Sequence, residues 1–203
     1  AYFEWEQWGD VYKYIANSHN FINVNFAKKQ QFWAFTLDIF HNIYNNPWTV
    51  ALKGKRILIV SPFIKSMQEK LDILPEIYGV DLFPECEFIF IQPPQTQGDS
   101  ESEEFDKELA KFMSKIVNIK DKFDIALCSC GGYGNLVCAE IYKLGKSAIY
   151  VGGVLQMFFG IYGNRWLKER PDIMRLYMNK HWTRPKEEEQ PEGHKKVEGG
   201  CYW

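Results

Sequence analysis

The chain has 203 residues, and its 24 basic and 26 acidic side chains leave a formal net charge of −2. With 46% hydrophobic residues it can bury a sizeable core, so a mainly disordered chain is excluded. The balanced charge offers no broad basic surface, and we expect neither nucleic acid nor an anionic membrane as a partner. Aromatic residues reach 16%. Their flat faces suit stacking on sugars or bases, although a large aromatic core is the simpler explanation.

Membrane and redox signals indicate a cytoplasmic protein. The longest nearly uncharged stretch, Val151–Asn164, is shorter than the about 20 apolar residues that a membrane-spanning helix needs. The first ten residues lack a basic stretch followed by an apolar one, so we expect no signal peptide in this sequence. Five cysteines without a regular framework indicate reduced thiols, and the Cys128-x-Cys130 spacing does not predict a metal site.

Residues 1–50 read as an N-terminal helical segment. Apolar residues recur there at helical spacing until Asn45-Asn46-Pro47, and we expect this segment to pack on the edge of a sheet. Asp38 lies on its apolar face between Leu37 and Phe40. Asp38 is therefore the acid in the chain that most resembles a buried one, as a structural partner or as a catalytic base.

Residues 51–182 predict a Rossmann-like core. Four short runs are apolar at consecutive positions, which is typical of parallel strands covered on both faces. These runs are Arg56–Val60, Glu87–Gln92, Asp124–Ser129 and Ser147–Val151.

Helical patterns separate these runs. They cover Ile64–Ile73, Phe105–Val117 and Tyr133–Leu144. Ser100 and Glu103 have the spacing of a capping box before the second pattern, and Pro75 and Gly145 would end the first and the third. The alternation predicts a single α/β domain, a doubly wound parallel sheet with flanking helices and right-handed crossovers.

Residues 183–203 predict an extended C-terminal arm. The run Lys186–Glu189 is typical of a solvated segment. The last residues, Gly199–Trp203, are apolar again, and we expect them to dock back onto the domain.

Ligands of open parallel sheets bind outside the carboxyl ends of the strands. The glycine-rich turn Ser129–Gly134 lies at such an end, where backbone N–H groups and a helix N-terminus suit a phosphate or diphosphate. A tight turn that needs positive φ explains the same glycines equally well. The turn lacks the G-x-G-x-x-G spacing of NAD enzymes, and the chain has no Walker motif of P-loop kinases.

Other polar residues follow the remaining strands. Gln156, after Gly152-Gly153, is a candidate to bind a base or a sugar hydroxyl. Arg165 suits a diphosphate and Trp166 a stacked ring, although a surface ion pair with Glu169 would also explain Arg165. The remaining rim candidates are Ser61, Pro62, Phe63, Gln95, Thr96 and Asn164. As general base we expect Asp38 first, with Asp10, His41 and Glu198 in reserve.

Several sequence blocks in fixed order resemble a family of glycosyltransferase domains. The blocks are NPW at 46–48, LKGKRILIVSPF at 52–63, CGGYG through GNRW at 130–166, HWTRP at 181–185 and VEGGCYW at 197–203. Similar domains occur in bacterial polysaccharide clusters and in multidomain glycan-assembly proteins of chloroviruses. The chain is also distantly similar to the GT-D group of Rossmann-like transferases.

This resemblance implies transfer of a sugar from a nucleotide diphosphate donor to a glycan acceptor, and we expect direct, inverting displacement. A UDP-sugar is expected as donor, with UDP-L-rhamnose among the candidates. Asp38 would be the base, and Arg165 would stabilise the leaving group. The donor site would be lined by Gly131, Gly132, Tyr133, Gly134, Gly152, Gly153, Gln156, Arg165 and Trp166.

The resemblance also bears on cofactors and partners. GT-D members carry an acidic pair for a divalent metal such as Mn²⁺, whereas this chain has only Gly9-Asp10, so no metal ligands are assigned. Neighbouring transferase domains in a longer polypeptide, and the host cytoplasm for a viral chain, would follow from the family. A non-catalytic nucleotide-binding module and another Rossmann-type transferase, such as a methyltransferase, are the alternatives.

Overall fold

The computed structural model describes residues 37–38, 43–44 and 46–203, which belong to the compact unit Leu37–Trp203. Most of the expected N-terminal helical segment, with Asp10 and His41, lies outside the described residues.

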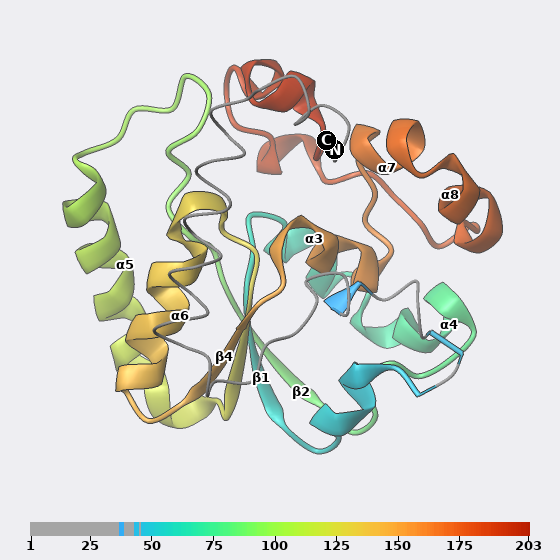
Figure 1. Ribbon diagram of the computed structural model, residues 1–203, viewed down its shortest axis with the longest axis horizontal. Helices are drawn as coiled ribbons and strands as arrows, with labels where there is room; N and C mark the ends of the chain where they lie inside the picture. The colour runs from blue at the N-terminus through green and yellow to red at the C-terminus, as the bar shows by residue number, and fades with distance from the viewer. Residues whose placement is uncertain (1–36, 39–42, 45) are drawn as a thin grey trace, which may run out of the picture. The chain divides into compact units, whose positions relative to one another are not determined.

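Four parallel strands form the sheet, in the order β2-β1-β3-β4 (Figure 1). The α/β, Rossmann-like prediction is thereby confirmed. The chain leaves β1 toward β2 on one side and then crosses to β3 and β4 on the other, so the order reverses between β1 and β3. The strands are β1 (Arg56–Val60), β2 (Glu87–Ile91), β3 (Ile125–Cys128) and β4 (Ser147–Tyr150).

Helices cover both faces of the sheet, which explains the continuous apolar runs. Ile57 and Ile59 of β1 pack into one cluster, Leu58 and Val60 into the opposite one, and all four are completely buried. The helices α5 (Phe105–Asn118) and α6 (Gly134–Lys143) lie on the Leu58 side. On the other face lie α3 (Ile64–Gln68) and α4 (Leu74–Tyr78) (Figure 1).

The predicted capping box before α5 and the predicted role of Pro75 are wrong. The helix α5 begins at Phe105, without a capping box at Ser100 and Glu103, because the Glu108 carboxylate accepts the backbone N–H of Glu103 at 3.1 Å. Pro75 does not end a helix but lies in the first turn of α4, where its missing N–H costs no hydrogen bond. The predicted end of α6 is confirmed, since Gly145 follows it with φ +76°.

After β4 the chain forms a long 3-10 segment, Gly152–Phe159, and then α7 (Asn164–Glu169) and α8 (Pro171–Tyr177). The C-terminal arm adds short 3-10 turns at Glu187–Glu189, His194–Lys196 and Glu198–Gly200. No helix in the described part of the chain is both long and apolar enough to cross a membrane.

One prediction for the arm is confirmed and another is partly wrong. Cys201 and Trp203 are buried, so the last residues do dock onto the domain. Within the charged run, however, Glu189 is buried rather than solvated. Its carboxylate accepts the backbone N–H groups of Lys65 at 2.7 Å and Ser66 at 3.2 Å, which lie in the first turn of α3. The arm is therefore anchored to the helix that follows β1.

Candidate functional site

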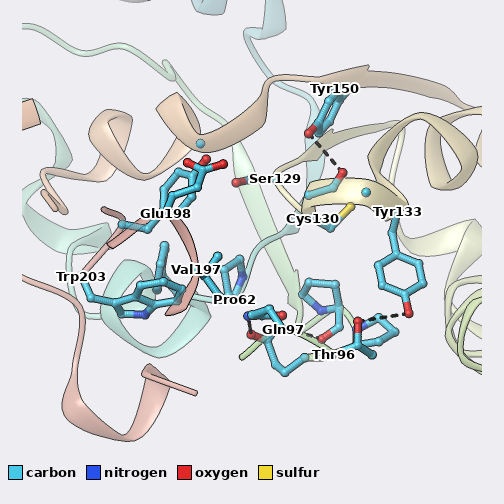
Figure 2. Close-up of a pocket in the computed structure, with 18 of the residues that line it drawn as sticks. Pro62, Thr96, Gln97, Ser129, Cys130, Tyr133, Tyr150, Val197, Glu198 and Trp203 are labelled. Atoms are coloured by element: carbon cyan, nitrogen blue, oxygen red, sulfur yellow. Dashed lines mark hydrogen bonds between the residues drawn. The ribbon is translucent and has the colours of Figure 1, made fainter. Parts of the chain in front are cut away.

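A cleft of about 460 Å³ opens at the carboxyl ends of the strands (Figure 2). Residues following all four strands contribute to it, and the C-terminal segment closes one side. It lies where the strand order reverses, which is where open α/β sheets bind their ligands. Its lining consists of Pro62, Phe63, Pro93, Pro94, Gln95, Thr96, Gln97, Phe105, Ser129, Cys130, Gly131, Gly132, Tyr133, Tyr150, Gly153, Val197, Glu198, Tyr202 and Trp203.

The glycine turn after β3 presents its backbone to this cleft. Gly131 has φ +52°, and a Cβ atom at Gly131 or Gly132 would meet nothing within 4 Å. Packing therefore does not explain these two glycines, and no described backbone acceptor takes their N–H groups. Gly134 differs, because a Cβ atom there would lie 2.2 Å from the Tyr150 ring. Two open N–H groups just before α6 can hold an anionic ligand group.

Aromatic rings and amides from the segments that follow β2 and β3 form another wall of the cleft. Phe105 stacks on Tyr133 with ring centroids 4.4 Å apart, and the Tyr133 hydroxyl lies 3.4 Å from Thr96 Oγ1. Gln97 Nε2 donates to Gln95 Oε1 at 2.7 Å. This wall offers flat apolar faces beside neutral hydrogen-bonding groups, a combination that suits sugars and bases.

Among the described residues, Glu198 is the only lining residue with a formal charge, and no lysine, arginine or histidine lines the cleft. Cys130 also lines it. Burial raises the pKa of the Cys130 thiol to about 12, so this thiol stays protonated at neutral pH and is a poor nucleophile. Glu198 is therefore the one carboxylate that the described lining offers as a general base.

Glu198 has an unusual backbone. Its φ is +47°, and Gly199 and Gly200 follow with φ +65° and +72°. A left-handed conformation costs a residue with a side chain about 1 kcal/mol, and such strain is concentrated at functional sites. Glu198 Oε2 accepts from the Arg165 guanidinium and from Cys201 Sγ at 3.2 Å. Within the described residues Oε1 has no hydrogen-bond partner, and it can accept one from a ligand.

The structure brings about half of the predicted site residues to the cleft. Those that line it are Pro62, Phe63, Gln95, Thr96, Gly131, Gly132, Tyr133 and Gly153. Gly134, Gly152, Ser61, Gln156, Asn164, Arg165, Trp166 and Asp38 do not line it. Gly152 has φ +75° in the turn after β4. Ser61 is buried, and its Oγ accepts the backbone N–H of Phe63 at 3.2 Å.

Several predicted ligand-binding residues hold the C-terminal segment instead. Gln156 is 1% exposed, and its Nε2 donates to the backbone oxygens of Ile161 and Tyr202. Asn164 Nδ2 donates to Gly200 O at 3.3 Å, and the backbone N–H of Arg165 donates to Cys201 O at 2.7 Å. These residues hold the C-terminal segment in place, and it is this segment that lines the cleft.

Glycines let the segment approach closely. A Cβ atom at Gly163 would lie 2.4 Å from the backbone carbon of Tyr202, and one at Gly153 would lie 2.5 Å from the Tyr202 ring. The glycines of these blocks are therefore explained by the docking of Tyr202, which needs no ligand.

Trp166 and Asp38 lie away from the cleft. Trp166 is buried in the core on the α3 and α4 face, where its ring is not accessible for stacking on a ligand. Asp38 is half-buried near Tyr78. Burial, and secondly the charge of Asp38, raise the pKa of the Tyr78 hydroxyl well above its usual range.

The C-terminal residues form more of the cleft than the sequence predicts. Glu198 was only a reserve base, and Tyr202 and Trp203 were not assigned to the site, yet all three line the cleft. A signal was present, since VEGGCYW places one acid beside two glycines and two aromatic residues at the point where the chain docks back.

In the part of the chain that the structure describes, no three side chains of His, Cys, Asp or Glu come together as a metal site would require. The lining supplies one carboxylate, so the described residues do not fit a divalent cation. No family model, curated protein or solved structure matches the chain.

Proposed function

We propose that this chain is a glycosyltransferase that moves a sugar from a nucleotide diphosphate donor, such as a UDP-sugar, to a hydroxyl group of a glycan. One observation carries the proposal. At the strand-order reversal, a single cleft combines open backbone N–H groups at Gly131 and Gly132 with one carboxylate, Glu198. Figure 2 shows Glu198 and Trp203 on one side of the pocket and Cys130 and Tyr133 on the other.

The two sides suit the two substrates. On the glycine side, the N–H groups before α6 would hold the diphosphate, and the Phe105–Tyr133 stack would extend under the nucleoside. On the opposite side, the rings of Tyr202 and Trp203 would hold the acceptor beside Glu198. Donor and acceptor bound in this way would lie within reach of each other.

Glu198 would act as general base in place of Asp38, which does not line the cleft. Its Oε1 atom takes the proton of the acceptor hydroxyl, and the acceptor oxygen forms a bond to the anomeric carbon of the donor. The bond from that carbon to the phosphate oxygen breaks, and its electron pair leaves with the nucleoside diphosphate. Direct displacement of this kind inverts the anomeric centre.

Calorimetric titration with UDP and measurement of transfer from UDP-sugars test the proposal. Glu198→Gln is expected to lower the transfer rate by about 10²–10⁴-fold, because a neutral amide cannot take the proton, and to leave UDP binding in place. Glu187→Gln, an exposed acid in the same arm, is the matched control. Unchanged transfer in Glu198→Gln would contradict the assignment of the base.

A second candidate function is methyl transfer, which is favoured by the absence of cationic side chains from the described lining. A diphosphate would be bound by backbone groups alone, whereas an S-adenosyl compound carries no phosphate and needs no such charge. Titration with S-adenosylhomocysteine separates the two. If the protein binds this compound and does not bind UDP, the proposed function becomes that of a methyltransferase.

A further inference from the structure

We propose that Arg165 is a positioning residue, which holds Glu198 and Tyr202 in the wall of the cleft and does not itself contact the donor. The inference rests on the proposed function, in which Glu198 is the base. It assigns Arg165 a role different from the charge stabilisation that the sequence predicts.

Within the described part of the chain, the polar and ring contacts of the Arg165 side chain lead into the C-terminal segment or into its own helix. Nη2 pairs with the Glu198 carboxylate, and Nη1 donates to the Tyr202 hydroxyl at 2.9 Å. The guanidinium carbon lies 4.6 Å from the centre of the Tyr202 ring. Nε lies 3.8 Å from Glu169 Oε1, too far for a hydrogen bond. One guanidinium group, which does not line the cleft itself, thus fixes two side chains that do.

Arg165 itself stays charged. Burial lowers its pKa, but the neighbouring Tyr202, Cys201 and Glu198 outweigh this effect and raise it. The guanidinium group is therefore available to pair with the Glu198 carboxylate at any pH near neutrality.

Glu198 depends on this partner because little else in the described structure holds it. Apart from Arg165, the Glu198 carboxylate bonds only to Cys201 Sγ, a weak donor. Its backbone is left-handed, and the two glycines that follow it, Gly199 and Gly200, allow other conformations. Without Arg165 the carboxylate would leave its position even though the cleft remained. A lysine could not substitute, since it has a single nitrogen where the guanidinium uses two in a planar fork.

A double-mutant cycle tests this role. Arg165→Ala is expected to lower kcat by about 100-fold, the typical effect of a misplaced catalytic group, with the affinity for UDP retained. In a Glu198→Gln background the same substitution should cost little more, because there is no base left to position. Guanidinium ion at low millimolar concentration should restore part of kcat in Arg165→Ala, whereas a purely structural role would give no such rescue.

The controls use the same residue type. Arg170→Ala removes an exposed ion pair with Asp172 and should leave kcat unchanged. Arg165→Lys should be nearly as slow as Arg165→Ala. If Arg165→Ala does not fold, Arg165→Lys and Tyr202→Phe can each replace it in the double-mutant cycle with Glu198→Gln.

The outcomes separate the inference from the function on which it rests. A loss of UDP affinity in Arg165→Ala, or equal kcat losses in both backgrounds of the cycle, would overturn the positioning role and leave the transferase standing. If the unaltered protein neither binds UDP nor transfers sugar, the proposed function fails. Amide hydrogen exchange of residues 197–203 then decides the inference alone, since exchange that is unchanged in Arg165→Ala would overturn it.

Discussion

At the amino ends of β1 and β3, Arg56 and Asp124 are bonded to each other, whereas at the carboxyl ends of the same strands polar groups face an open cleft. Arg56 Nη2 lies 2.7 Å from Asp124 Oδ1, and the Arg56 backbone N–H donates to Asp124 Oδ2 at 2.9 Å. At the other end, the Gly131 and Gly132 N–H groups and one oxygen of Glu198 have no described partner.

This difference separates stabilising groups from candidate binding groups. Polar atoms that satisfy one another join strands and leave nothing for a ligand. Polar atoms without partners, next to left-handed backbone and an open volume, are available for binding. Substitutions at the two ends should therefore affect different properties.

The largest effect is expected at Gly163, where the C-terminal wall of the cleft packs. Gly163→Ala would place a methyl group 2.4 Å from the Tyr202 backbone, and the segment must shift. We expect a loss of about 1–3 kcal/mol in the free energy of unfolding, measured by urea denaturation, together with weaker ligand binding.

Gly132→Ala is the matched control for Gly163→Ala. Its Cβ atom would meet nothing within 4 Å, and the stability should stay unchanged. If the two variants had equal stabilities, Gly163 would not be explained by the docking of Tyr202.

A smaller effect is expected at Glu189, which anchors the arm to α3. Glu189→Gln weakens the bonds to the Lys65 and Ser66 N–H groups and should cost about 1 kcal/mol, visible as a lower melting temperature. Glu188→Gln alters an exposed neighbour in the same charged run and should have no comparable effect. A run that was solvated throughout would give the two variants the same melting temperature.

The smallest effect is expected at the amino end. The hydrogen bond from Arg56 lowers the pKa of Asp124 from 3.8 to about 2. Because the folded pKa is the lower one, this pair stabilises the protein above pH 3.8, and the contribution is lost as the pH falls toward 2. Asp124→Asn should remove this part of the acid dependence in denaturation curves. Ligand binding should not change, and a loss of binding would break the contrast between the two ends.

The sequence predicted the strands to within one residue at each end, but it wrongly predicted a capping box before α5 and missed the start of α4. Strands buried on both faces need apolar side chains at every position, so their pattern is unambiguous. The capping box at Ser100 depended on a short motif, and Glu108 competes for the same backbone donor. Pro75 is compatible with both a helix end and a helix start, and only the packing of α4 distinguishes them.

For the site, the sequence correctly predicted that the glycine turn lines the cleft. It wrongly favoured Asp38 over Glu198 as the acid with access to the cleft. Asp38 was favoured because it lies among apolar residues, yet it is Glu198 that lines the cleft. Glu198 lies 67 positions after Gly131 of the glycine-rich turn. No local pattern connects positions that far apart.

Alternation of apolar runs and amphipathic stretches by itself determined the class of fold, because the periodicity of burial is a local property of the chain. The docking of the last seven residues, Val197–Trp203, was decided by the tertiary structure, since it depends on the close approach that Gly153 and Gly163 allow. That docking places the Glu198 carboxylate opposite the turn after β3, a juxtaposition that arises only when distant segments pack together.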